Sequence, residues 1–226
     1  MTDRHSTLRA RRRAETQHAI QAHAVRLFTE HGYDATTVDD VASAAGVSPM
    51  TLYRHFPTKE HLVLLDQQGK LIAERISASS ADQSQISRIG GALIDWARTV
   101  TAGSRGAELT ADTQFLLALL RLMIVTPALR AKHLDNHYTL QKAIVGALTD
   151  EGTDPDTLFH TEVVASACLA AMHTALVRWT EDDGQVELPD LIGKALTAAF
   201  VDDNGGAEMK ARLSHPSDID RYRKSG

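Results

Sequence analysis

The feature that most constrains this chain is a pair of short helical segments separated by a glycine, Gly46. Thr37 precedes the first segment and Asp40 follows it three residues later, a spacing that predicts a capping box. Ser48 precedes the second segment, and Pro49 takes its first helical position, where the missing N–H costs nothing. Glycine adopts left-handed backbone angles cheaply, so Gly46 suits a tight turn between the two segments. The pattern predicts a helix-turn-helix.

The rest of the chain is also predicted to be helical. Ile20, Ala24, Leu27 and Phe28 follow the spacing of one face of a helix, which we expect to run from about Arg9 to His31. Thr58 is expected to cap a long, continuous fourth helix that reaches about Ser77. Apolar spacing and the positions of proline and glycine predict further helices around 89–100 and 115–126, then over about 129–150, 155–179 and 189–200.

These signals divide the chain into four parts. We expect a basic N-terminal arm over residues 1–13 and a helix-turn-helix domain over 14–58. A larger helical domain follows over 59–203, and a mobile polar tail over 204–226. The first sixty residues carry a net charge of +1, although the whole chain carries −5. A basic front on an acidic body is typical of a DNA-binding protein, whereas a frayed, solvated terminus is the plainer alternative.

The second helix of the pair has the chemistry that reading a DNA groove requires. Leu52 and Phe56 are placed to face the core, which leaves the polar side chains pointing outward. Arg54 is suited to pair with guanine, and the side chains around it are suited to thymine methyl groups and to phosphates. The candidate DNA-binding residues are Arg11, Arg12, Arg13, Thr37, Ser48, Pro49, Met50, Thr51, Tyr53, Arg54, His55 and Lys59.

Other classes of protein find little support in the sequence. It has no phosphate-binding loop, nucleophile elbow or zinc-protease motif, so we expect neither an enzyme nor a bound cofactor. His133 and His137, with Asp135 nearby, are too few ligands for a metal site, and none is predicted. The single cysteine, Cys168, is interpreted as a small packing residue and fits a reducing cytoplasm. No apolar stretch is expected to span a bilayer, and we expect no membrane association.

The segment from Ala35 to Glu60 resembles the DNA-binding signature of the TetR family of bacterial regulators. The similar region extends over about residues 16–64 and includes Leu27-Phe28 and Gly32-Tyr33. The resemblance implies an all-α protein of about nine helices, with a three-helix head and a larger ligand-binding and dimerisation domain. It further implies a homodimer formed by the last two long helices, and DNA contacts from Thr37, Thr51, Tyr53, His55 and Lys59.

A second likeness concerns the body. The segment 123–131, together with Arg178-Trp179, is similar to actinobacterial members that bind acyl-CoA-like ligands. Arg121 and Arg130 are candidates to meet an anionic head group. The residues expected to line a pocket, with core or dimer interface as the alternative for each, are Trp96, Phe115, Leu119, Met123, Tyr138, Met172, His173 and Trp179.

The expected function is a ligand-responsive repressor. It would bind a near-palindromic, double-stranded operator as a homodimer through Pro49–His55, and a small hydrophobic effector such as an acyl-CoA would release it. Two alternatives stay open at this point. One is an effector-independent activator or architectural DNA-binding protein, and the other is a module whose helix-turn-helix contacts another protein.

Overall fold

The computed structural model describes residues 3–64, 68–104 and 108–200; for residues 3–11 and Leu134 it describes the backbone alone. The described residues form α-helices joined by short loops, with one 3₁₀-helix (η1) and no strand. The elements are α1 (Asp3–His31), α2 (Val38–Ala44), α3 (Pro49–His55), η1 (Glu60–Val63), α4 (Gln68–Ala78), α5 (Gln85–Val100), α6 (Ala111–Val125), α7 (Pro127–Leu148), α8 (Pro155–Glu181) and α9 (Leu188–Phe200).

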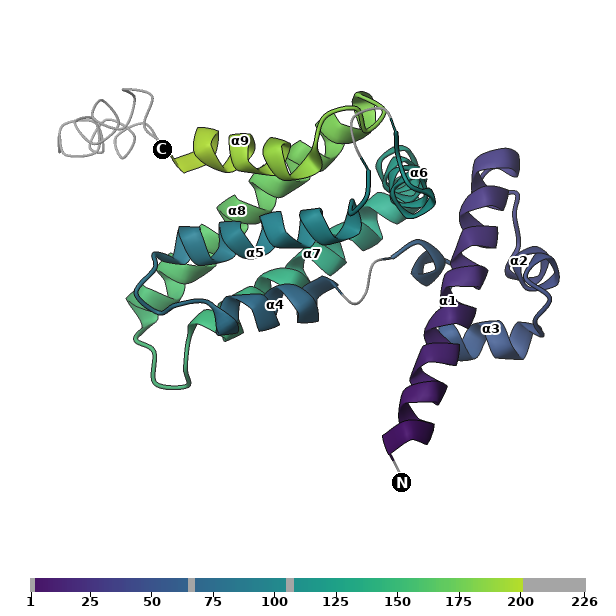
Figure 1. Ribbon diagram of the computed structural model, residues 1–226, viewed down its shortest axis with the longest axis horizontal. Coiled ribbons are helices and arrows are strands. Elements are labelled where there is room, and N and C mark those ends of the chain that lie inside the picture. Colours follow the sequence, from purple (N-terminus) through teal and green to yellow (C-terminus); the bar gives the residue numbers. More distant parts are fainter. Residues whose placement is uncertain (1–2, 65–67, 105–107, 201–226) are drawn as a thin grey trace, which may run out of the picture.

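The first three helices form a head at one side of the molecule (Figure 1). The long α1 runs past α2 and α3, which lie on the side of α1 that faces away from the other helices. Apolar side chains from all three helices meet beneath them, including Phe28, Val41 and Leu52, and each of these is buried. The head therefore has a small apolar core that holds the two short helices in place.

Local signals place the turn between α2 and α3 as the sequence predicts. The Thr37 hydroxyl accepts a bond from the Asp40 N–H, and the Asp40 carboxylate accepts one from the Thr37 N–H, which completes the capping box. Ser48 caps α3, and Pro49 is its first residue. Gly46 has a φ of 67°, the left-handed region that glycine adopts without strain. The expected helix-turn-helix is confirmed.

The remaining helices form a body that contains most of the buried apolar residues. α4 packs on α7, α8 packs on α9, and α5 contacts α4, α8 and α9. α6 lies between the head and the rest of the body, where it contacts both α1 and α7 (Figure 1). The predicted all-α class, with a helix-turn-helix head and a larger helical body, is confirmed by this arrangement.

Two helix boundaries differ from those predicted. α1 begins at Asp3, so the basic residues expected to form an arm continue the first helix. The expected helix from Thr58 to Ser77 is interrupted: η1 ends at Val63, and Leu64 after it has extended backbone angles. The contacts of η1 with α1, α6 and α7 explain why the chain turns here instead of continuing as a helix. The expected polar tail, 204–226, lies outside the described residues.

One further expectation needs correction. α8 is long and apolar enough to cross a membrane by length and composition, contrary to the expectation that no stretch would be. More than half of its most apolar window is buried inside the protein, against the helices packed around it. Cys168 lies in this buried face, and burial raises the pKa of its thiol to about 12. α8 therefore has the burial expected of the central helix of a helical body, and its cysteine is an unreactive packing residue.

Leu52 should contribute more to stability than its neighbour Met50, because Leu52 is fully buried and Met50 is 75% exposed. We expect Leu52→Ala to lower the free energy of unfolding by about 2–5 kcal/mol, through lost burial and the cavity left behind. Met50→Ala should change it by less than about 0.5 kcal/mol. Urea denaturation of both variants measures this difference, and equal effects would contradict the packing of α3 described above.

Candidate nucleic-acid interface and ligand cavity

The outer face of α3 presents a continuous set of side chains to solvent. Met50, Tyr53 and Arg54 are all exposed, whereas Leu52 anchors the opposite face of the helix in the core. Thr51 is half-buried, and its backbone N–H donates to the Ser48 hydroxyl at 3.1 Å. The helix is therefore capped and packed on one side, and its other side is free to enter a groove.

Positive charge gathers at the C-terminal end of α3. His55 is half-buried, and its Nδ1 has no hydrogen-bond partner. Burial lowers the pKa of His55, and the nearby charges of Arg13 and Arg54 lower it further. Arg13, on α1, thus contributes to the same electrostatic field as the end of α3. Both Arg12 and Arg13 are exposed, while the side chain of Arg11 lies outside the described set.

Thr37 is less available to an anion than its place before α2 indicates. Its hydroxyl donates to the Asp40 carboxylate at 2.6 Å and accepts the Asp40 backbone N–H. These hydrogen bonds hold the pKa of Asp40 below its ordinary value. Asp39 adds a second carboxylate in the same first turn. The Thr37 hydroxyl and N–H both already donate to Asp40, so a phosphate that contacts Thr37 has to share these donors with the Asp40 carboxylate.

Lys59 is held by the head itself. Its ammonium group donates to the Tyr33 carbonyl and lies 4.1 Å from the centroid of the Tyr33 ring. The Tyr33 hydroxyl in turn donates to Glu60 at 3.2 Å. Burial and the Glu60 carboxylate both raise the pKa of Tyr33. Lys59 thus joins the end of the helix-turn-helix to the loop after α1, and one of its N–H groups is already used.

A cavity of about 220 Å³ lies within the body, between α6, α7 and α8. It borders a smaller crevice of about 30 Å³ that shares several of the same walls. The walls of the larger cavity are mostly apolar, but one side carries imidazole and guanidinium groups. Its lining residues are Leu120, Met123, Ile124, Arg130, His133, His173, Leu176 and Val177.

Three histidines meet where the cavity and the crevice join. His133 Nε2 lies 3.4 Å from His173 Nδ1, and the rings of His133 and His137 are stacked. His133 Nδ1 and His137 Nε2 are buried and have no hydrogen-bond partner. Burial, His173 and His137 together lower the pKa of His133 to about 4. No group of three or more histidine, cysteine or acidic residues among the described ones is arranged to hold a metal ion.

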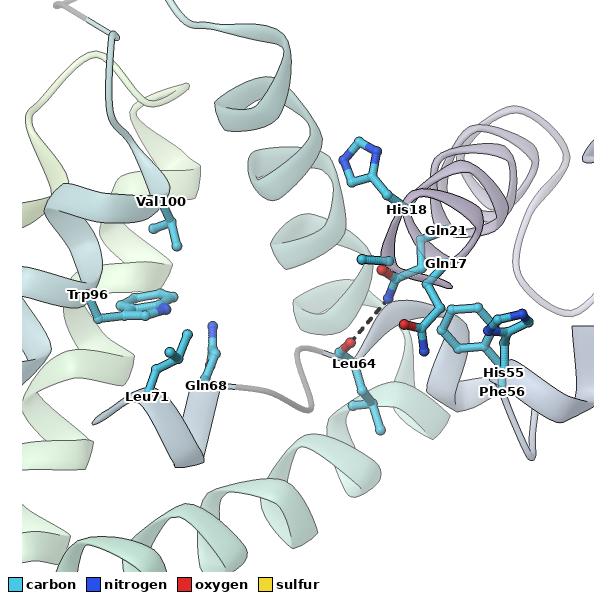
Figure 2. A pocket seen from close by; sticks show the side chains of 11 residues that line it. Gln17, His18, Gln21, His55, Phe56, Leu64, Gln68, Leu71, Trp96 and Val100 are labelled. Atoms are coloured by element: carbon cyan, nitrogen blue, oxygen red, sulfur yellow. Dashed lines mark hydrogen bonds between the residues drawn. The ribbon is translucent and has the colours of Figure 1, made fainter. Parts of the chain in front are cut away.

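A second cavity, of about 290 Å³, separates the head from the body (Figure 2). Gln17, Gln21 and His55 line its head side, and Trp96 and Leu71 line its body side. The Gln21 amide donates to the Leu64 carbonyl at 3.3 Å across the point where the chain passes from head to body. The polar side of this second cavity is therefore formed by the amide groups of glutamines and the imidazole of His55.

The residues predicted to bind a ligand fall into separate places. Met123, Met172 and His173 line the cavity and crevice of the body, whereas Trp96 lines the cavity between head and body. Tyr138 is 59% exposed and lies beneath the Lys142 ammonium group. The structure also does not bring the remaining three to the body cavity: Phe115 contacts His18, Leu119 is buried in the core, and Trp179 packs near Gly184.

His133 and His137 are not among the residues that the sequence predicts to line a pocket. Their i, i+4 spacing predicts one shared helix face, which the structure bears out, but this spacing does not show that the face borders a cavity. Arg121 and Arg130 were both candidates for an anionic head group. Arg121 is held by Asp183 and the Thr180 carbonyl, whereas Arg130 lines the cavity. Their different partners depend on tertiary contacts that helical spacing does not encode.

Comparison with known families finds a match for the N-terminal part of the chain and another for its C-terminal part. The family described as bacterial regulatory proteins, tetR family, matches residues 20–65, which include α2, α3 and η1. The family described as the MftR C-terminal domain matches residues 96–199, which include α6 to α8 and most of α9.

Individual relatives agree with this result. The chain is 27% identical to the HTH-type transcriptional regulator TcmR of Streptomyces glaucescens, over 76% of each chain. It is 26% identical to MftR of Mycobacterium tuberculosis, named for mycofactocin biosynthesis, over 84% of this chain and 92% of that one. Among solved structures it resembles the fatty acid degradation regulator FadR of Bacillus halodurans, with a TM-score of 0.53 and 17% identity over 80% and 96% of the two chains. That last likeness concerns the fold alone.

The half-buried His133 should make the protein less stable in acid. His133 has a lower pKa in the folded protein, about 4, than its ordinary 6.5, so the unfolded chain binds the proton more readily. Its contribution to stability is therefore complete above about pH 6.5 and is lost as the pH falls toward 4. We expect Tm to decrease from about pH 7.5 to about pH 5, and to decrease less in His133→Gln. His160→Gln, on the exposed part of α8, is the matched control, and an unchanged slope in His133→Gln would contradict this account.

Proposed function

The chain belongs to the TetR family of bacterial transcriptional regulators, and from that premise we propose that it is a dimeric repressor released from its operator by a small effector. A regulator of this kind has no enzymatic activity. The observation that carries the proposal is the outer face of α3, where Met50, Tyr53 and Arg54 are exposed on a helix whose other face is anchored in the head.

The proposed DNA contacts follow from the chemistry of that face. Arg54 is unpaired among the described residues and offers a planar set of donors that matches the edge of guanine in the major groove. Tyr53 and the nearby arginines of α1 are placed to bind phosphates. The same field that lowers the pKa of His55 attracts the backbone of DNA. Lys59 contributes through its remaining N–H groups, and mainly holds the head together.

The proposed dimer uses the outer faces of α8 and α9. Phe159 and Val163, one turn apart on α8, are 67% and 50% exposed. Large apolar side chains left in solvent on one face favour burial against a second copy. A two-fold dimer would place its two α3 helices in successive major grooves, about 34–36 Å apart, on a near-palindromic site.

The proposed effector site is the cavity between α6, α7 and α8. A ligand there would touch Leu120, Met123 and Ile124 on α6. The other end of α6 contacts α1, where the His18 ring lies 5.5 Å from the Phe115 ring. Movement of α6 would therefore reach the head directly through this contact with α1. Coupling of this type amounts to about 1–3 kcal/mol.

Arg54→Ala should weaken binding to the specific operator by about 1–3 kcal/mol and relax the preference for one base pair. The measurement is fluorescence anisotropy on DNA upstream of the protein's own gene, at two salt concentrations, with base-substituted sites in parallel. Arg178→Ala is the matched control, because Arg178 lies on α8 and forms surface ion pairs with Glu181 and Asp182.

Two outcomes of that experiment would count against the proposal. Equal weakening on every sequence would assign Arg54 to phosphate instead of a base. Failure of the wild-type protein to bind this DNA specifically at either salt concentration would reject the operator proposal, since phosphate contacts alone give salt-sensitive but unspecific binding.

Phe159→Glu should shift the protein from dimer to monomer, because it places a charge in the proposed apolar interface. Analytical ultracentrifugation over a range of protein concentrations measures the dissociation constant of the dimer. Val125→Glu, at the exposed corner between α6 and α7, is the control and should leave the dimer intact. A wild-type monomer at all concentrations, or an unaffected dimer in Phe159→Glu, would refute this interface.

A further inference from the structure

We propose that the cavity between α6, α7 and α8 takes a small carboxylic acid, whose apolar body packs on α6 and α8 and whose carboxylate is held by Arg130 and the histidine cluster. This inference rests on the proposed effector site and names the class of ligand that would occupy it. The histidine cluster is His133, His137 and His173.

The charges around the cavity favour an anion. None of the described residues that line it or the neighbouring crevice is acidic. Arg130 lines the cavity and has an exposed side chain, so the part of the wall that it forms also meets solvent. Among the described residues no carboxylate pairs with Arg130. Asp183 pairs with Arg121, and Asp135 pairs with Lys132. A planar guanidinium without a partner is the group best suited to a carboxylate.

The histidine cluster has two buried ring nitrogens, His133 Nδ1 and His137 Nε2, that the protein leaves without a hydrogen-bond partner. A neutral imidazole has one N–H donor and one acceptor nitrogen. When His173 Nδ1 donates to His133 Nε2, at 3.4 Å, the proton on His133 is placed at Nδ1, which is buried and unpartnered. His133 Nδ1 has almost no exposed surface, so an acceptor in the cavity reaches it only when the His133 ring rotates, and that contact would recover the free energy that an unpaired buried polar atom costs. A carboxylate oxygen is such an acceptor, and it selects the tautomer in which His133 Nδ1 carries the proton.

The opposite wall is suited to an apolar body. Leu120, Met123 and Ile124 on α6 face Leu176 and Val177 on α8, and together they form a surface that offers no charge. Met123 adds a flexible thioether, which adapts to irregular shapes. One side of the cavity is therefore hydrophobic and the other is cationic or donor-rich, which is the pattern that an amphipathic acid requires.

The size of the cavity limits the length of that acid. Its volume of about 220 Å³ is below the range of roughly 300–1,000 Å³ typical of sites for drug-sized ligands. A single aromatic ring or a short alkyl chain with one carboxylate fits this space, whereas an entire acyl-CoA does not. The occupant inferred here is therefore smaller than the acyl-CoA that the sequence resemblance implies.

Direct binding without DNA tests this proposal separately from the proposed function. Isothermal titration calorimetry and thermal shift would compare phenylacetate, benzoate and hexanoate with their primary amides, which keep the shape but lack the charge. Lauroyl-CoA would be titrated in parallel. We expect at least one acid to bind and its amide to bind about tenfold or more weakly, because a charge-assisted pair is lost.

Two variants locate the site. Arg130→Gln removes the charge at the cavity, and it should bring the affinities of the acid and its amide close together. Arg98→Gln, an exposed arginine on α5 that pairs with Asp95, is the matched control and should preserve the difference. Circular dichroism and Tm confirm that both variants fold.

The proposal is overturned if no acid binds, if an acid and its amide bind equally, or if lauroyl-CoA alone binds. It is also overturned if Arg130→Gln leaves the preference for the acid unchanged. Because none of these readouts involves DNA, a protein that binds the acid but no operator would retain this site and refute the repressor instead. A protein that binds the operator but none of the acids would retain the repressor proposal and refute this site.

Discussion

A helix of seven residues is not stable by itself in water, because isolated helices shorter than about 12–15 residues are marginal. α2 and α3 are each of this length, so their position depends on the burial of one face in the apolar core of the head. Leu52 provides that burial for α3, and the caps at Thr37 and Ser48 satisfy backbone groups that the short helices leave free. The exposed face of α3 has a defined orientation only because its other face is fixed in this way.

Much of the head could be predicted from sequence because its determinants are local. Capping residues, the proline at the start of α3 and the glycine in the turn act within a few positions of one another. The interruption before α4 could not be predicted in this way, because the apolar pattern from Thr58 onward is compatible with a continuous helix. It depends on the packing of η1 against α1, α6 and α7, which helical spacing does not encode.

The cavity between α6, α7 and α8 shows the same limit. Met123, Met172 and His173 were expected to line a pocket and do so, whereas Trp96 lines the cavity between head and body. The spacing of an amphipathic helix predicts which of its apolar residues face the interior of the protein. It does not predict whether that part of the interior is filled by side chains or contains a cavity. His133 and Arg130 belong to the cavity because α7 crosses α6 and α8 there, and this crossing is a property of the fold as a whole.

The contact between Lys59 and Tyr33 has a consequence for the thermodynamics of recognition. It joins two points 26 residues apart, so the segment that contains α2 and α3 is closed at both ends within the folded protein. The entropy of closing such a loop is lost during folding, before any DNA is present. Association of the head with DNA therefore does not have to order α2 and α3, and a larger part of the contact energy is retained as affinity.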